Sequence, residues 1–109
     1  MIEAGAPVDV QNAEGQTVLH IASIQGDEKI VRILFMSRAN ASIVDNEDRA
    51  PIHLAAERGH TTIVEFLVDN FKASVHERTR DGSTLMHIAA VNGHPDTAMI
   101  LFDRGVCLL

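Results

Sequence analysis

One eleven-residue phrase occurs three times in this chain, with small changes. It reads TVLHIASIQGD at 17–27, APIHLAAERGH at 50–60 and TLMHIAAVNGH at 84–94. When the copies are aligned on their histidines, His20, His53 and His87 are 33 and then 34 residues apart. A period of this length predicts one supersecondary unit repeated in a row, because each unit must bury its apolar face against the next.

We divide the 109 residues into repeats at 12–44, 45–78 and 79–109, the last of them truncated. Residues 1–11 are then the tail of a preceding repeat. Both ends of the chain are apolar, at 1–2 and 106–109, whereas the terminal units of a repeat array need polar outer faces for solubility. We therefore expect one stretch cut from a longer array, and we expect isolated samples to pair end to end.

Each copy of the phrase predicts a short helix with defined ends. Thr17 and Thr84 precede the apolar residues as N-cap hydroxyls, a role worth about 1 kcal/mol each. The middle copy has Ala50 at this place and puts Pro51 at the first helical position, where its fixed φ suits a helix. Each helix should end at a glycine, which accepts the left-handed conformation at low cost. These glycines are Gly26, Gly59 and Gly93.

A second helix is predicted after each glycine, over 28–36, 61–69 and 96–103. Apolar residues recur in these segments at i, i+3 and i+4, which predicts one buried stripe on each helix. The stripe consists of Ile30, Ile33 and Leu34, then Ile63, Phe66 and Leu67, then Ile100 and Leu101. The first helices are shorter than the roughly 12–15 residues at which isolated helices become stable. Stacking against neighbours must therefore hold them.

The turn before each phrase predicts a left-handed residue. Gly15 lies in AEGQ and Gly82 in RDGS, and the middle copy has Asp48 at this position. Glycine adopts positive φ without a Cβ clash, and aspartate is one of the few other residues that tolerate it.

The phrase resembles the core signature of the ankyrin repeat, T-P-L-H-x-A-A-x-x-G-H, and the likeness covers essentially the whole chain. The resemblance implies an all-α solenoid of stacked antiparallel helix pairs with β-hairpin-like finger loops. Arg38 and Lys72 depart from the family, which prefers glycine there, and one extra residue near 70–72 lengthens the middle repeat. We expect backbone strain or a widened helix exit at both places.

The same resemblance implies a structural role for the motif histidines, as a bracket between the helix start and the neighbouring loop backbone. His20 then pairs with Thr17 and His87 with Thr84, whereas His53 faces Ala50 and has no hydroxyl partner. From this we predict that the middle finger, 45–50, is the least firmly held. A shared metal is not expected, because imidazoles one stacking step apart cannot converge on an ion at ~2.0–2.1 Å.

Composition and motifs argue against several other classes of protein. A net charge of −6 disfavours nucleic-acid and anionic-lipid surfaces, which require basic residues. Cys107 is the single cysteine, so no internal disulfide is possible and a reducing, cytoplasmic compartment is expected. No apolar run reaches the roughly 18 residues of a membrane span. No nucleophile–base pattern or phosphate-binding loop occurs, so we expect no enzyme, catalytic residue or cofactor.

Variable positions on the fingers and the first helices remain as the candidate protein-binding surface. They are Glu14, Gln16, Glu47, Arg49, Glu57, Arg58, Arg80, Val91 and Asn92. The three arginines are the best anchors, because arginine is enriched among residues that dominate binding energy. A simple solvated rim is the alternative, because exposed charges usually contribute little.

Two functions compete. The segment FKASVHERTRDGSTLMHIAAVNGH, at 71–94, is similar to the ankyrin array of the TRPN (NOMPC-type) mechanotransduction channels. That resemblance implies an elastic cytoplasmic tether between microtubules, or another cytoskeletal protein, and a plasma-membrane pore. The alternative is a protein–protein interaction module that binds a partner through its concave face of fingers and inner helices.

Overall fold

The computed structural model describes residues 8–104. The apolar ends at 1–2 and 106–109, and Cys107, lie outside these residues. The described part is all-α, as predicted, and contains no strand. Its helices are α1 (Val18–Gln25), α2 (Glu28–Met36), α3 (Pro51–Glu57), α4 (Thr61–Asp69), α5 (Leu85–Val91) and α6 (Pro95–Asp103).

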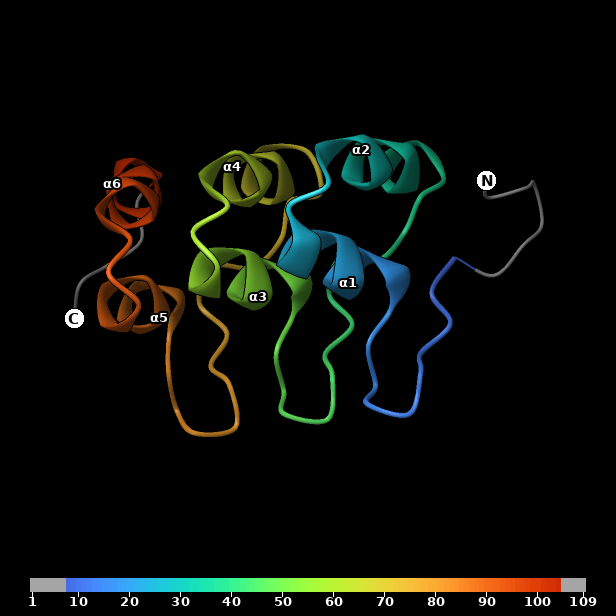
Figure 1. Ribbon diagram of the computed structural model, residues 1–109, viewed down its shortest axis with the longest axis horizontal. Coiled ribbons are helices and arrows are strands. Elements are labelled where there is room, and N and C mark those ends of the chain that lie inside the picture. Colours follow the sequence, from blue (N-terminus) through green and yellow to red (C-terminus); the bar gives the residue numbers. More distant parts are fainter. Residues whose placement is uncertain (1–7, 105–109) are drawn as a thin grey trace.

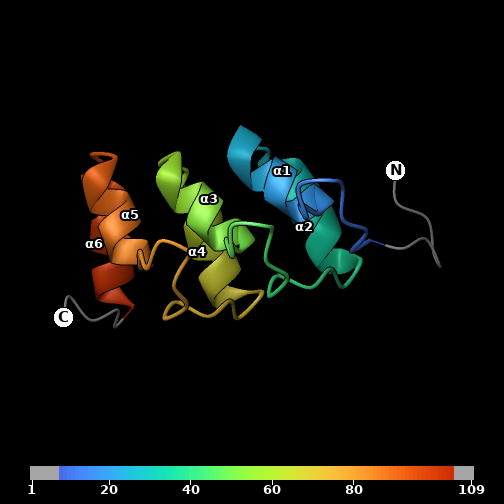
Figure 2. The same cartoon turned by 90° about the horizontal axis from the view of Figure 1, so that it is seen from below.

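The helices form antiparallel pairs that stand side by side in a row. Figure 1 shows two layers, with α1, α3 and α5 in one and α2, α4 and α6 in the other. A long loop hangs from the start of each helix of the first layer, and these loops are the fingers (Figure 1). In the view from below, the pairs follow one another along the long axis (Figure 2), and the molecule measures 41 × 24 × 20 Å. This is the stacked solenoid that the repeats predicted.

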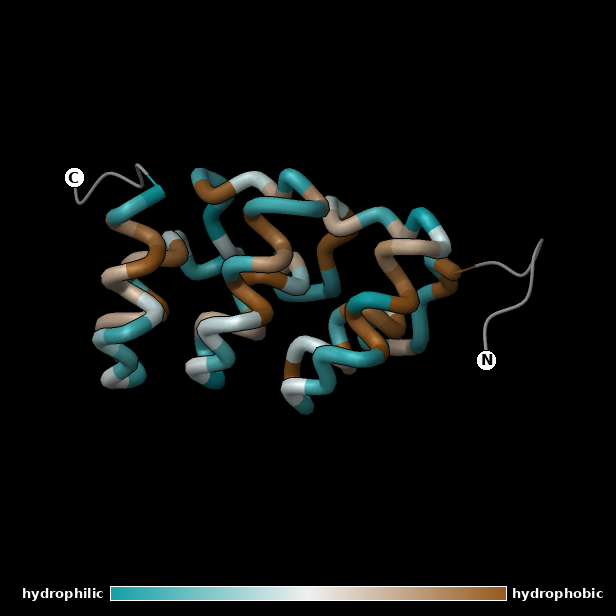
Figure 3. Tube along the Cα trace, turned by 90° about the horizontal axis from the view of Figure 1, so that it is seen from above, coloured by the Kyte–Doolittle hydropathy of each residue, from teal (hydrophilic) through white to brown (hydrophobic). Residues whose placement is uncertain are grey.

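The core is aliphatic and repeats with the helices. Leu34, Leu67 and Leu101 are completely buried at equivalent positions of the outer helices. Ala55 and Ala89 are completely buried on the inner helices, where small side chains let neighbouring helices approach closely. Hydrophobic and hydrophilic stretches alternate along each helix (Figure 3). Each helix is therefore held by its neighbours and not by its own propensity.

The predicted stripe is wrong at Ile33, which is 48% exposed. The equivalent residue one repeat later is Phe66, which packs edge to face against Phe35 of α2. This helix position therefore faces the preceding pair. The described residues contain no helix pair on that side of α2, so Ile33 remains uncovered.

The strain expected at the two unusual helix exits is confirmed. Arg38 and Lys72 have φ values of 64° and 58°, in the left-handed region that disfavours side chains. The exit of the middle pair is also longer: the Ala39 N–H bonds to Leu34 O, whereas the Ala73 N–H reaches back one residue further, to Leu67 O.

The extra residue of the middle repeat has a packing role that the sequence did not reveal. Phe71 lies in the lengthened exit and contacts both Phe35 and Phe66, with ring centroids 5.2 and 5.9 Å away. Edge-to-face aromatic pairs add about 0.5–1.5 kcal/mol beyond their buried area. The insertion therefore supplies a contact between the first two helix pairs.

Candidate functional site

The first motif histidine joins its own helix to the following finger. The Nδ1 atom of His20 accepts hydrogen bonds from the Thr17 N–H and hydroxyl, at 3.0 and 2.9 Å. A ring nitrogen that accepts an amide proton is unprotonated, so the other nitrogen carries the hydrogen. That Nε2–H lies 2.8 Å from the carbonyl oxygen of Arg49, to which it donates. His20 is therefore neutral, with both ring nitrogens in use.

His53 repeats this arrangement without the hydroxyl. Its Nδ1 accepts from the Ala50 N–H at 3.0 Å, and its Nε2 donates to the Glu77 carbonyl at 3.0 Å. Burial lowers the pKa of both His20 and His53, because the charged imidazolium would lose its hydration. His87 bonds to the Thr84 N–H and hydroxyl at 3.3 and 2.7 Å, and it is exposed.

The expectation that the middle finger is the least firmly held was wrong. The Asp45 carboxylate accepts from the backbone N–H groups of Glu47 and Arg49, both at 2.9 Å, and from Arg49 Nε at 3.0 Å. The His20 ring adds its bond to the Arg49 carbonyl. His20 therefore holds finger 45–50 from the preceding repeat, and His53 still accepts from the Ala50 N–H, so the missing hydroxyl at Ala50 does not leave this finger loosely held.

A second set of histidines, His60 and His94, bonds to the preceding repeat instead of the following one. The Nε2–H of His60 donates to the Ile24 carbonyl at 3.0 Å, and that of His94 donates to the Glu57 carbonyl at 2.9 Å. Each ring therefore satisfies a carbonyl at the end of the preceding inner helix. Neither residue was among the candidates named from the sequence, in which each directly follows a helix-ending glycine. The signal was the repeated Gly-His pair, which is Gly-Asp in the first copy.

The fingers also bond to one another through their backbones. The Asn46 N–H donates to the Glu14 carbonyl and the Arg80 N–H to the Glu47 carbonyl, both at 3.0 Å. The predicted left-handed residues are confirmed at the finger tips, with positive φ at Gly15, Asp48 and Gly82. Neighbouring fingers are thus joined by backbone hydrogen bonds beside the inner helices.

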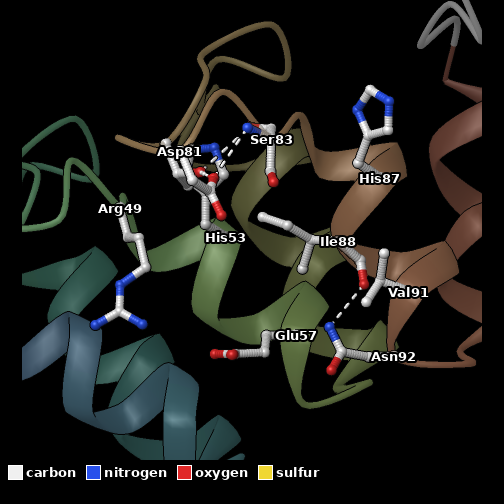
Figure 4. Close-up of a pocket in the computed structure, with 10 residues that line it drawn as sticks. Arg49, His53, Glu57, Asp81, Ser83, His87, Ile88, Val91 and Asn92 are labelled. Carbon is white, nitrogen blue, oxygen red and sulfur yellow. Dashed lines mark hydrogen bonds between the residues drawn. The ribbon is translucent and has the colours of Figure 1, made fainter.

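Most of the candidate binding residues are exposed on the fingers or on the inner helices. Glu14, Glu47, Arg58, Arg80, Val91 and Asn92 are exposed, whereas Gln16, Arg49 and Glu57 are half-buried. The structure brings Arg49, Glu57, Val91 and Asn92 together around one groove of about 290 Å³ (Figure 4). The other five, Glu14, Gln16, Glu47, Arg58 and Arg80, do not line it.

The groove lies between α3, α5 and the 79–84 finger. Its remaining lining residues are His53, Thr79, Asp81, Ser83, His87 and Ile88. Asp81 belongs to the RDGS turn and was not among the candidate binding residues. Its carboxylate accepts from the Thr79 hydroxyl and the Ser83 N–H, and these bonds lower its pKa. Asp81 therefore presents a negative charge at the finger edge of the groove.

Two of the three candidate arginines are already paired. Arg49 Nε lies 3.0 Å from an oxygen of the buried Asp45 carboxylate, and Arg80 Nε lies 3.8 Å from Asp48 Oδ2. The second pair is well exposed, so it contributes little stability. Arg58 forms no ion pair among the described residues.

No metal or membrane site is found in residues 8–104. No group of three His, Cys, Asp or Glu side chains could hold an ion there. No helix in that range is long and apolar enough to cross a bilayer.

These features define a class of protein: a repeat scaffold of short helix pairs, tied by histidine and finger bonds, with a continuous exposed face. A family model described as ankyrin repeats (3 copies) matches residues 1–79 and 34–108. The chain belongs to the ankyrin-repeat family.

Similar proteins differ widely in their names. The chain is 35% identical over 101 residues to the E3 ubiquitin-protein ligase KEG of Arabidopsis thaliana, covering 90% of this chain and 6% of that protein. It is 30% identical over 97 residues to human ankyrin repeat domain-containing protein 63, covering 86% and 26%. It is 31% identical over 101 residues to the mouse B-cell lymphoma 3 protein homolog, covering 90% and 22%. The chain thus spans about a quarter or less of these relatives.

Proposed function

We propose that this chain is a non-enzymatic stretch of an ankyrin solenoid that binds another protein through its fingers and inner helices. The observation that carries the proposal is the groove between α3, α5 and the 79–84 finger, where Val91 is 83% exposed beside charged side chains. Ile88 lines the groove beside Val91, and an apolar patch rimmed by polar residues is typical of a protein-binding surface.

The hydrogen-bonded scaffold supports binding because it fixes the surface before a partner arrives. The finger backbones are bonded to one another, and the His20 and His53 rings hold the segments that follow them. A surface that is already ordered loses less conformational entropy on binding, so more of the contact energy appears as affinity.

The test compares matched surface variants in partner capture from cells. Charge reversal at Glu57 and Arg58 changes the inner face, whereas charge reversal at Glu28 and Lys29 changes the outer helix α2 by the same amount. We expect the inner-face variant to lose captured proteins that the outer-face variant retains, with unchanged thermal unfolding for both. Equal capture by both variants would contradict the proposal.

A second function, the elastic tether of a mechanosensitive channel, rests on a different observation. Within residues 8–104, each helix pair packs substantially only on its immediate neighbours. Such a row extends by adding small rotations at each interface. This proposal places the segment in the cytoplasm, between microtubules or another cytoskeletal protein and a TRPN-type pore, with neighbouring repeats of one array as its direct partners.

Force spectroscopy on a longer array that contains this segment tests the tether. We expect reversible, nearly linear extension before any repeat unfolds. Immediate stepwise rupture at low extension would count against an elastic role and would leave the binding proposal intact.

A further inference from the structure

We propose that the groove between α3, α5 and the 79–84 finger binds an extended partner segment that carries arginine or lysine next to an aliphatic residue. This inference rests on the proposed binding function and specifies the chemistry of the partner. It is carried by the arrangement of two carboxylates around an apolar floor.

The apolar floor comes from one helix. Ile88 and Val91 of α5 both line the groove, and Figure 4 shows their side chains on the same side of it. Asp81 lies on the finger side and Glu57 on the α3 side (Figure 4). An aliphatic side chain that covers Ile88 and Val91 therefore places its neighbours close to one carboxylate or the other.

Among residues 8–104, neither edge carboxylate has a cationic partner. Within this range the Asp81 carboxylate accepts only from neutral donors, the Thr79 hydroxyl and the Ser83 N–H. Glu57 has no lysine or arginine within salt-bridge distance among the described residues. Both therefore remain available to a charged donor from outside.

The cation that lines the groove does not cancel this charge. Arg49 is held by Asp45, whose side chain is almost completely buried and so stays beside it. The His53 ring is neutral, because its Nδ1 accepts an amide proton. With Asp45 and Arg49 taken as a neutral pair, the groove keeps the two negative charges of Glu57 and Asp81.

The chemistry favours a cationic peptide over other ligands. The chain carries a net charge of −6, which repels nucleic acids and other polyanions. The residues that line the groove do not form a three-ligand cluster for a metal ion. Arginine and lysine suit the site because their long stems cover apolar surface while their charged ends reach carboxylates.

The direct test uses fluorescein-labelled nonapeptides of alanine and serine with a central Arg-Leu-Arg, measured by fluorescence anisotropy. One comparison peptide carries Glu-Leu-Glu and another carries Arg-Ser-Arg. We expect binding of Arg-Leu-Arg to be roughly tenfold tighter than that of Arg-Ser-Arg, because a leucine side chain adds apolar contact. No binding of Glu-Leu-Glu is expected, and Arg-Leu-Arg binding should weaken as salt is raised.

Matched protein variants locate the site. Glu57→Gln with Asp81→Asn removes both groove charges at constant shape, and Glu28→Gln with Asp96→Asn removes two charges from the outer helices. We expect roughly a tenfold loss of Arg-Leu-Arg affinity for the first variant and little change for the second, because only the groove charges contact the peptide. Circular dichroism confirms folding, and Glu57→Gln alone serves if Asp81→Asn disturbs the finger.

Three results overturn the inference: equal loss of affinity in both double variants, equal binding of the Glu-Leu-Glu peptide, or no binding of any peptide at millimolar concentration. The proposed function fails separately, in the capture experiment with the inner-face and outer-face variants. If captured proteins depend on the inner face while these peptides do not bind, only the cationic specificity is wrong.

Discussion

The Nε2 atom of His20 lies 2.8 Å from the carbonyl oxygen of Arg49, 29 residues further along the chain. The same ring accepts a hydrogen bond from the Thr17 N–H at the start of its own helix. One neutral imidazole therefore joins the first turn of α1 to the finger of the next repeat. His53 makes the equivalent connection from Ala50 to Glu77.

Replacing a buried motif histidine should loosen the stack. In His53→Ala, the Ala50 N–H and the Glu77 carbonyl lose their partner and a buried ring is removed. We expect a loss of about 2–4 kcal/mol in the free energy of unfolding, measured by urea denaturation. The matched control is His87→Ala, which removes an exposed ring and should cost less than about 1 kcal/mol. Equal losses would show that the inter-repeat bond contributes nothing.

The buried histidines should make stability depend on pH. Burial lowers the pKa of His20 and His53 below the ordinary value of 6.5, so the unfolded chain binds more protons as the pH falls from about 6.5. The contribution of the two neutral rings to the free energy of unfolding should therefore be fully present above pH 6.5. It should be lost as the pH falls through the folded-state pKa values of His20 and His53. Urea denaturation between pH 7.5 and 5.5 measures this, because most carboxylates stay ionised there.

Proton NMR identifies the groups responsible for this pH dependence. The ring signals of His20 and His53 should keep their neutral chemical shifts below pH 6.5. If both rings titrated at the ordinary pKa of 6.5 and stability did not depend on pH, the neutral, hydrogen-bonded state of these two imidazoles would be contradicted.

The sequence predicted most of the fold because its local rules repeat. Three copies of the motif, each with an N-cap threonine or a proline at its start and a glycine at its end, indicated where the inner helices begin and end. The positive φ values at Asp48 and Gly82 followed from turn chemistry alone. Contacts between repeats were harder to foresee. The bond from the His53 ring to Glu77 and the contact of Phe71 with Phe35 join residues 24 or more positions apart, which local periodicity does not report.

The groove was predicted only in part for the same reason. Glu57 and Val91 were identified as variable exposed positions, but nothing in the sequence placed them around one depression with Asp81. Whether Glu57, Val91 and Asp81 lie around one groove depends on the offset between neighbouring helix pairs. That offset is set by the buried side chains between the pairs and by the finger bonds.

Relief of the left-handed strain should stabilise the protein. Lys72 has a φ of 58° and its side chain is exposed, so Lys72→Gly removes a Cβ clash with little loss of packing. We expect a gain of about 0.5–1 kcal/mol in the free energy of unfolding, because the relieved strain exceeds the added freedom of the unfolded chain. Lys72→Ala is the control: it removes the same charge but retains the Cβ, so no comparable gain is expected.

The helix-ending glycines allow the cost of φ to be separated from the cost of space. Gly59 and Gly93 have nearly the same φ, 72° and 71°, so alanine at either position meets the same backbone penalty of about 1–2 kcal/mol. At Gly59 a Cβ would also lie 2.6 Å from Nδ1 of the His94 ring, whereas at Gly93 nothing lies within 4 Å. Displacing that ring breaks its 2.9 Å bond to the Glu57 carbonyl. Gly59→Ala should therefore lower the thermal midpoint clearly more than Gly93→Ala, and the difference should shrink when His94→Ala is already present. Equal effects of the two glycine substitutions would mean that the second set of histidines does not hold neighbouring repeats together.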